Sequence, residues 1–353
     1  MRKLDGYIMR AVAGAMFLVM VVVLSLDFVF GFIGELDGTR GDYQTWQALE
    51  FMLLTIPRRI YDYLPLGAFM GCLIGLGSLT SSSELTVMRA AGISIKRIVW
   101  SAMKPTLVVV LIGVLVGEYV APPLERIAQS EKAVAKGASP NLASDTGVWH
   151  REGNTFIHLN AVQPNGVLHG VSLFEFDGDH WLAKATYAPR ALYQKGYWLL
   201  EKPVTTVLSE SGTRQVKRQQ LRWETGLTPE VLSVLIVPPE NLSMTGLFTY
   251  ASYLDDQELQ STRYWLAFWK KLLMPLATAV MVLVAISFIF GPLRTSTMGF
   301  RIFTGLIVGL LFKYMQDLLG PMSLVFGFSP VLAIVVPIAI NAAVGALLMR
   351  RAG

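Results

Sequence analysis

Long apolar runs alternate with polar segments along the chain, and six of the runs are long enough to cross a membrane. They occupy about residues 11–33, 62–80, 99–121, 268–290, 302–320 and 328–349. A bilayer core needs roughly 20 mostly apolar residues per helix. The first run is too long for the apolar part of a secretory signal and lacks a small-residue cleavage site. The pattern therefore predicts six transmembrane helices, grouped three and three.

The segment between the third and fourth runs follows a different period. Apolar and polar residues alternate there in four stretches that are bounded by turn sequences such as Pro164-Asn165-Gly166, Asp177-Gly178-Asp179 and Lys195-Gly196. The stretches are 147–158, 166–176, 181–193 and 197–208. This alternation predicts an antiparallel β-domain.

Helical patterns flank the predicted β-domain on both sides. Residues 122–136 continue the third run as a polar helical extension. Before the fourth run, a short amphipathic helix is marked by Leu247, Tyr250, Ala251 and Leu254. We therefore expect helices one to three in residues 1–121, an extracytoplasmic β-domain with its flanking helices in 122–262, and helices four to six in 263–353.

The distribution of Lys and Arg predicts the orientation of the helices. One side collects eleven of them: Arg2, Lys3, Arg10, Arg89, Lys96, Arg97, Lys104, Arg294, Arg301, Arg350 and Arg351. The short loops of the other side hold only Arg40, Arg58 and Arg59. Because cytoplasmic loops carry the basic excess, both termini are expected in the cytoplasm.

Composition agrees with a membrane protein and narrows the partners. The chain of 353 residues is 53% hydrophobic and 16% charged, where a soluble domain has about 25% charge. The basic residues behind its net charge of +5 gather in the loops expected on the cytoplasmic side, as in other membrane proteins, so nucleic acid is not expected as a partner. The single cysteine, Cys72, excludes an internal disulfide and a cysteine-cluster metal site.

Sequence motifs for catalysis are missing. The chain has no Gly-Lys dipeptide and hence no Walker A loop, and it has no Gly-x-Ser-x-Gly, His-Glu-x-x-His or Cys-x-x-Cys motif. All four histidines fall in the predicted β-domain without metal-ligand spacing: His150, His158, His169 and His180. We expect neither an enzyme nor a bound metal or cofactor.

One polar loop stands out, at residues 81–93 between the second and third runs. Ser81-x-x-Glu84 matches a capping box, and Gly92 is a natural residue after a helix C-terminus, so a two-turn helix is expected. Leu85, Met88 and Ala91 share one face of it. Either this face rests on the membrane helices and Glu84 only caps, or the helix couples the chain to a nucleotide-hydrolysing subunit.

Four motifs in chain order resemble the lipopolysaccharide-export permeases of the LptF/LptG family. They are Gly75-Leu76-Gly77-Ser78-Leu79, the run Ser83-Glu84-Leu85-x-Val87-Met88-x-Ala90-x-Gly92, Gly117-Glu118-Tyr119-Val120-Ala121-Pro122, and Ser287-Phe288-Ile289-Phe290-Gly291-Pro292-Leu293-Arg294. The resemblance extends over the whole chain. The last of the four is most similar to the LptG branch of the family.

The resemblance implies a role, a location and a set of partners. It implies the permease subunit of an ABC exporter in the bacterial inner membrane, extracting lipopolysaccharide and passing it through a periplasmic β-jellyroll to a bridge protein. The implied partners are an LptF-like permease, an LptB-like ATPase dimer that uses ATP and Mg, and a membrane-anchored LptC-like protein. On this basis the coupling residues would be Glu84, Leu85, Met88, Arg89 and Gly92.

Lipopolysaccharide has acyl chains and an anionic, phosphorylated head, so its path needs apolar surface and cations near the outer membrane surface. Candidate phosphate contacts are Arg58, Arg59, Lys132, Arg263 and Lys271. Lys270 and the other basic residues near Trp265 and Trp269 fit equally well as an interfacial belt. Candidate cavity or gate residues, on the two spans that the resemblance associates with lateral gates, are Asp27, Phe28, Phe30, Ile33, Leu311 and Phe312.

Three charged features are unusual for this family or for a membrane helix. The outer end of the first run is acidic, with Glu35 and Asp37, where some family members are basic. Asp27 lies within an apolar run, at a cost of roughly 2.5–3.5 kcal/mol if it were at the helix centre, and is expected to face water or a partner helix. Lys313 and Asp317 lie one turn apart and could pair with each other.

Two other classes of function compete with transport. A membrane-anchored scaffold or assembly factor for the cell envelope would use the β-domain for binding, but it requires neither outer cations nor a docking helix. A membrane enzyme acting on lipid would require a convergent acid, base or metal cluster, and the sequence contains none.

Overall fold

The chain divides into two compact units, each of which we describe by itself. The computed structural model describes residues 2–39, 43–137, 148–163, 166–178, 181–194, 196–209, 212–229, 232, 238–256, 260–290 and 296–352. The membrane unit comprises Met1–Val29, Pro57–Val120 and Ser243–Gly353, and the β-unit comprises Phe30–Ile56 and Ala121–Leu242.

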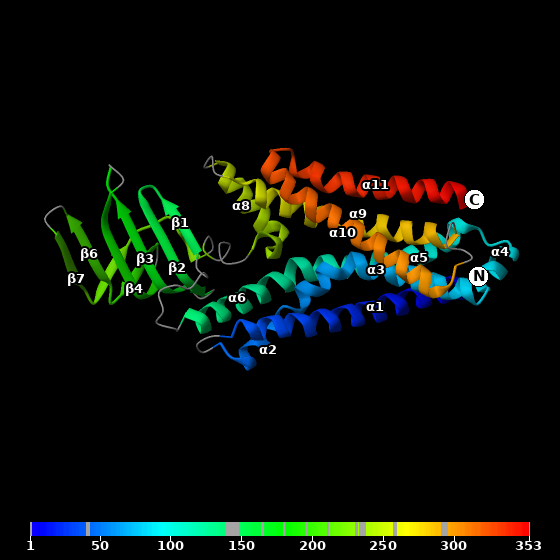
Figure 1. Cartoon of the computed structure of the whole chain (residues 1–353), viewed down its shortest axis with the longest axis horizontal. Helices are drawn as coiled ribbons and strands as arrows, with labels where there is room; N and C mark the ends of the chain where they lie inside the picture. The colour runs from blue at the N-terminus through cyan, green and yellow to red at the C-terminus, as the bar shows by residue number, and fades with distance from the viewer. Residues whose placement is uncertain are drawn as a thin grey trace. The chain divides into compact units, whose positions relative to one another are not determined.

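The membrane unit is entirely helical among its described residues (Figure 1). Its helices are α1 (Arg2–Asp37, whose last turns belong to the β-unit), α3 (Ile56–Ser81), α4 (Glu84–Ala90), α5 (Ile95–Leu115), α8 (Met244–Asp256), α9 (Thr262–Phe290), α10 (Met298–Phe326) and α11 (Pro330–Ala352). A π-helical turn, η1 (Val116–Val120), joins α5 to the β-unit helix α6 (Ala121–Gly137).

Six helical segments of the described chain are long and apolar enough to span a membrane. They are Lys3–Asp37, Ile56–Ser81, Ile95–Lys136, Thr262–Phe290, Gly299–Phe326 and Pro330–Arg350. Each overlaps one run of the sequence analysis, so the prediction of six membrane helices with an inserted β-domain is confirmed. The polar extension of the third span and the short helix before the fourth are also present, as α6 and α8.

Small residues allow α1 and α10 to approach α3 closely. Gly67, Gly71 and Gly75 face α1, where a Cβ at Gly71 would lie 2.3 Å from the Cα of Met16. On α10, a Cβ at Gly305 would lie 2.4 Å from a methyl carbon of Leu73 of α3. Because lipid gives helices no hydrophobic drive to associate, such close backbone contact is the main source of packing energy between membrane helices.

Among its described residues, the β-unit contains the α-helices α2 (Thr45–Leu54) and α6 and the 3-10 turn η2 (Pro239–Asn241) beside its strands. Its strands are β1 (Val148–Glu152), β2 (Thr155–Gln163), β3 (Val167–Phe176), β4 (Leu182–Gln194), β5 (Tyr197–Glu201), β6 (Val204–Ser209), β7 (Gly212–Lys217) and β8 (Gln220–Trp223). All of these pairings are antiparallel, in the order β1-β2-β3-β4-β5-β8, with β6 on β4 and β7 on β6. Figure 1 labels β1 to β4, β6 and β7.

The long strand β4 divides the sheet into two branches. Its first half, Lys184–Tyr187, pairs with β6, and its second half, Arg190–Gln194, pairs with β5. An apolar cluster built from β2, β3, β4, β5 and β8 includes Trp198, whose indole N–H donates to the carbonyl of Leu227 at 2.8 Å. Among the described residues, the branch formed by β6 and β7 contributes no side chain to this cluster.

The structure corrects the predicted elements of this unit in three places. The stretch 147–158 contains a hairpin of β1 and β2 that turns at Gly153 (φ 59°), and 197–208 contains β5 and β6, which part at Lys202 (φ 47°). Helix α2 was not predicted, because its ten residues carry no strong apolar period. The predicted turn residues Pro164, Asn165, Asp179 and Lys195 lie outside the described residues.

Candidate functional site

The loop between α3 and α5 forms the expected short helix, but its N-terminus is built differently from the prediction. Ser81 ends α3, and its hydroxyl donates to the carbonyl of Gly77 at 3.0 Å instead of capping α4. The N-cap residue is Ser83, which has a left-handed backbone (φ 61°) and makes no side-chain cap. The predicted capping box is therefore wrong: α3 extends far enough to include the serine that was expected to start the next helix.

The C-terminus of α4 follows the prediction at Gly92. Its φ is +87°, a conformation that favours glycine. Gly92 N–H donates to the carbonyl of Arg89 at 3.0 Å, and Ile93 N–H donates to that of Met88 at 3.1 Å. These two bonds form a Schellman motif, which ends the helix sharply.

The apolar side of α4 is already covered by this chain. Leu85 and Met88 are 3% and 8% exposed and belong to the main apolar cluster of the membrane unit. The side chains of Thr86, Val87 and Ala90 are exposed, whereas Arg89 is half-buried. A partner that docks on α4 in this conformation would therefore contact the exposed side of the helix and not Leu85 or Met88.

Glu84 has two polar neighbours within the membrane unit. Its carboxylate accepts a hydrogen bond from the Ser82 hydroxyl at 2.8 Å, and the Tyr7 side chain of α1 lies within electrostatic reach of it. Arg97 of α5 binds Asp5 of α1 through two N–H groups, each 2.9 Å from a carboxylate oxygen. This pair joins the N-terminal turns of α1 and α5, while α4 contacts the membrane unit through Leu85 and Met88.

Asp27, expected to face water or a partner helix, pairs with a cation of the same chain. Its carboxylate forms an ion pair with Arg59 of α3 and accepts a hydrogen bond from the Tyr63 hydroxyl at 2.7 Å. Both charged side chains are mostly buried. Arg59, a candidate phosphate contact, is therefore already neutralised by Asp27 in this structure.

Lys132, a second candidate phosphate contact, has a carboxylate partner in the β-unit. Its ammonium group lies 2.5 Å from a Glu35 oxygen and 4.2 Å from the centre of the Phe51 ring of α2. The Tyr43 hydroxyl donates to the same Glu35 oxygen at 2.9 Å. Burial, with help from Glu35, raises the pKa of Tyr43, so this hydroxyl stays protonated as a donor. The acidic end of α1 and the basic face of α6 are thus complementary.

The other three candidate cations have different surroundings. Arg58 lies 3.7 Å from Asp62 one turn along α3. Lys271 of α9 donates to the Gly117 carbonyl at 3.4 Å and lies 5.3 Å from the centre of the Tyr61 ring. Arg263, at the start of α9, is exposed. Arg58 and Lys271 thus both lie near the Asp62 carboxylate, so the structure brings these two of the three candidates together.

The candidate gate residues differ in exposure. Phe30 and Leu311 are 70% and 63% exposed, and Ile33 is exposed as well, whereas Phe28 is half-buried. Phe312 is 5% exposed and packs in the main cluster of the membrane unit. Of the two candidates on α10, Leu311 and not Phe312 is therefore exposed to meet a lipid chain.

The predicted pair of Lys313 and Asp317 on α10 does not form. Asp317 instead lies 3.7 Å from the ammonium group of Lys270 of α9. Lys313 lies 5.9 Å from the centre of the Tyr63 ring of α3. Lys313 and Asp317 therefore each contact a side chain of a neighbouring helix and not each other.

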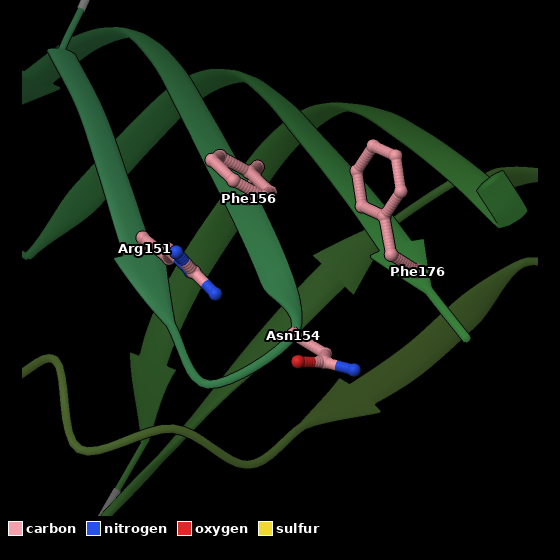
Figure 2. Close-up of a pocket in the computed structure, with 4 residues that line it drawn as sticks. All are labelled: Arg151, Asn154, Phe156 and Phe176. Carbon is pink, nitrogen blue, oxygen red and sulfur yellow. The ribbon is translucent and has the colours of Figure 1, made fainter. Parts of the chain in front are cut away.

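The outer surface of the sheet carries aromatic side chains and a small hollow. Trp149 stacks on Phe174 with ring centres 5.9 Å apart and lies 4.6 Å from His158. The hollow has a volume of about 270 Å³, and Figure 2 shows the residues that line it: Arg151, Asn154, Phe156 and Phe176.

The described histidines do not gather at a metal site. Among the described residues, no group of three or more His, Cys, Asp or Glu side chains is placed to hold a metal ion, and His180 lies outside them. Burial lowers the pKa of His150, His158 and His169, and for His169 the nearby Arg190 lowers it further. These imidazoles are therefore favoured in their neutral form.

Comparison with known proteins decides the family. The family model "Lipopolysaccharide export system permease LptF/LptG" matches residues 6–351. The lipopolysaccharide export system permease protein LptG of Haemophilus influenzae is 34% identical over 337 residues, which cover 95% of this chain and 94% of that protein. LptG of Escherichia coli K12 is 33% identical over 341 residues, with the same coverage. The chain belongs to the LptF/LptG family.

Two of the motifs that resemble LptF/LptG permeases have clear structural roles. Glu118, within η1, accepts hydrogen bonds from the N–H groups of Met244 and Thr245, at 2.6 and 3.2 Å, and so caps the N-terminus of α8. In the fourth motif, the Ser287 hydroxyl donates to the carbonyl of Gly345 in α11 at 3.0 Å. Residues 291–294 of that motif lie outside the described residues.

The sequence does not reveal the contacts of three charged residues. It presents Glu118 only as part of a motif, Glu35 only as an acidic exception in the family, and Arg301 only as a basic residue that indicates orientation. Each acts on a segment more than 90 residues away in sequence. The sequence does show a charged residue in or beside an apolar helix. Such a residue requires a partner, but the sequence does not indicate which residue the partner is.

Proposed function

We propose that this chain is the permease subunit of an ABC exporter that extracts lipopolysaccharide from the inner membrane and delivers it through its β-unit to a periplasmic bridge. The membership of the LptF/LptG family over residues 6–351 carries this proposal. Six candidate membrane helices and an inserted β-sheet supply the expected parts. ATP would be hydrolysed by a partner ATPase, with an LptF-like permease and an LptC-like protein completing the complex. Both termini would lie in the cytoplasm and residues 122–262 in the periplasm.

Helix α4 is proposed as the docking site of the ATPase. It presents Thr86, Val87 and Ala90 outward, and the Glu84 carboxylate lies at its first turn. Leu85 and Met88 anchor the helix on the membrane unit, and Gly92 ends it sharply. A force applied to the exposed side of α4 would therefore act on a helix that is fixed to its own transmembrane helices.

Lipopolysaccharide phosphates are proposed to contact the cations that now bind carboxylates. Arg59 and Lys132 each contact one acidic side chain, Asp27 and Glu35 respectively. The cation is already removed from water in its contact with the carboxylate. A phosphate that replaces the carboxylate therefore binds without a further cost of desolvating the cation. Apolar surface for acyl chains is supplied within the membrane unit by the exposed side chain of Leu311, and within the β-unit by those of Phe30 and Ile33.

Substitution of Glu84 tests the docking proposal. Glu84→Ala should weaken co-purification of the ATPase and lower ATP-driven lipopolysaccharide export about tenfold, the effect of losing one charged hydrogen bond. Tyr7→Phe removes a neighbouring hydroxyl of Glu84 but leaves the Glu84 carboxylate. Glu131→Ala removes an exposed carboxylate of α6 and serves as the control.

The comparison of these variants distinguishes docking from internal support. Docking predicts a large effect of Glu84→Ala and little effect of Tyr7→Phe or Glu131→Ala. Equal losses in Tyr7→Phe and Glu84→Ala would show that Glu84 serves only its own chain. A wild-type chain that purifies with neither an ATPase nor lipopolysaccharide would favour an envelope scaffold instead.

A further inference from the structure

A regular stripe on α10 faces α3. Arg301, Gly305 and Gly309 are spaced four residues apart and so lie on one side of the helix. The two glycines lie close to Leu73 and Leu66 of α3. Arg301 continues the same stripe at the N-terminal end of α10, beside the last turn of α3.

Arg301 is the charged residue of this stripe, and its buried side chain contacts the α3 backbone directly. It is 2% exposed, and one of its N–H groups lies 2.6 Å from the carbonyl oxygen of Gly77 and 3.1 Å from the Ser81 hydroxyl oxygen. Carbonyls in the last turn of a helix carry partial negative charge, so a cation is favoured there. Apolar packing would fill the same space without the desolvation cost of a guanidinium, which suggests a role beyond stability.

The segment that Arg301 holds leads straight into α4. Only Ser82 and Ser83 separate Ser81, the last residue of α3, from Glu84, the first residue of α4. Ser83 has φ 61°, which is unfavourable for a residue with a side chain, so this two-residue link is constrained. The position of α4 is therefore set by the end of α3, and the end of α3 is bound by Arg301.

We propose that Arg301 is a positioning residue that transmits displacement of α4, through Gly77 and Ser81 at the end of α3, to α10. The inference rests on the proposed function, because α4 receives force only if an ATPase docks there. Through Arg301, the end of α3 that leads into α4 has a direct polar contact with α10, the helix on which Leu311 lies. The glycine contacts of α10 on α3 extend this connection along the helix.

The test measures coupling and not assembly alone. The complete complex is reconstituted in lipid vesicles with purified lipopolysaccharide, and both ATP hydrolysis and lipopolysaccharide transfer are measured. Arg301→Lys keeps the charge but replaces the planar fork by a point charge. It should leave ATPase binding and hydrolysis within about twofold of wild type, and lower lipopolysaccharide transferred per ATP about tenfold.

Further variants locate the effect at the end of α3. Ser81→Ala removes the contact of Arg301 with the Ser81 hydroxyl and should lower the transfer ratio about threefold, as loss of a modest hydrogen bond would. Because both side chains act at one contact, the double variant should be no worse than Arg301→Lys alone. Arg350→Lys, an exposed arginine on α11, is the matched control and should behave as wild type.

Several outcomes would overturn the inference. A wild-type transfer ratio in Arg301→Lys contradicts it, as do fully additive effects in the double variant. If Arg301→Lys fails to assemble, a wild-type ratio in Ser81→Ala contradicts it instead. A wild-type complex that binds no ATPase contradicts the proposed function itself, whereas a functional wild type with fully coupled variants contradicts only the role of Arg301.

Discussion

At the scale of single residues, charged side chains near the membrane are paired within this chain. Asp27 binds Arg59, Glu35 binds Lys132, and Asp317 lies near Lys270. An isolated charge in a bilayer is costly, so the sequence required partners for these residues. It did not identify them, because the members of these pairs lie on different helices and are joined only by packing.

The buried pair of Asp27 and Arg59 gives a prediction of stability. Asp27→Asn leaves the Arg59 cation mostly buried without its carboxylate and should lower the free energy of unfolding by about 2 kcal/mol. The double variant Asp27→Asn with Arg59→Gln should recover part of this loss. Thermal unfolding of the full chain in detergent measures both.

The half-exposed pair of Arg58 and Asp62 provides the control. Surface ion pairs contribute about 0–1 kcal/mol, so Asp62→Asn should change stability little. Equal effects of Asp27→Asn and Asp62→Asn would mean that burial does not determine the contribution of these pairs. Normal lipopolysaccharide export by Asp27→Asn would limit its role to stability.

At the scale of elements, close helix contact depends on glycines whose importance the hydrophobic pattern does not reveal. Gly67, Gly71 and Gly75 read as interruptions of an apolar run, yet they form the face of α3 that contacts α1. Gly14 of α1 has no atom within 4 Å of its missing Cβ. The same residue type therefore has opposite consequences at two positions in adjacent helices.

These positions predict a graded series of alanine variants. Gly71→Ala places a methyl group against the α1 backbone and should destabilise the chain by about 2–3 kcal/mol. Gly67→Ala meets the flexible Met20 side chain and should cost less. Gly14→Ala should be neutral or stabilise by up to about 1 kcal/mol, because alanine favours helix. Thermal unfolding in the same detergent gives the order, and a reversed order would contradict the close contact.

The sheet makes a prediction about pH. Burial lowers the pKa of His158 and His169, so the unfolded chain binds protons at a higher pH than the folded sheet. The contribution of these two neutral imidazoles to the free energy of unfolding is therefore fully present above about pH 6.5, the pKa of histidine in the unfolded chain. It is lost as the pH falls through the lower pKa values of the folded sheet. Amide exchange in β2 and β3 of the full chain, corrected for its intrinsic pH dependence, should show less protection at pH 5 than at pH 7.5.

A variant tests whether these imidazoles cause the loss. The double variant His158→Gln with His169→Gln cannot take up the protons, so protection of β2 and β3 should vary less with pH. An unchanged pH dependence in this variant would assign the effect to other groups of the sheet.

At the scale of the whole molecule, the proposed topology can be tested with single cysteines. Cys72 is fully buried and is replaced by serine to give a background without thiols. Ser82→Cys, before α4, should react with a membrane-impermeant maleimide only after the membrane is opened to the cytoplasmic side. Thr213→Cys, in β7, should react from the periplasmic side; both positions are exposed. Labelling of Thr213→Cys only from the cytoplasm would contradict the orientation.

The sequence by itself determined the six membrane helices, the inserted antiparallel strands, and the short helix that ends at Gly92. These features depend on local quantities: the length of an apolar run, a period of two, and a glycine that permits a left-handed backbone. The family motifs are also local. For this reason the family could be inferred before any fold was known.

Only the tertiary structure decided which side chains meet. It paired Asp27 with Arg59 and Asp317 with Lys270, covered Leu85 and Met88, buried Phe312, and placed Arg301 on the end of α3. Such contacts depend on the rotation and approach of helices far apart in sequence. One glycine or one helical turn changes these quantities without altering the hydrophobic pattern, so the pattern cannot encode them.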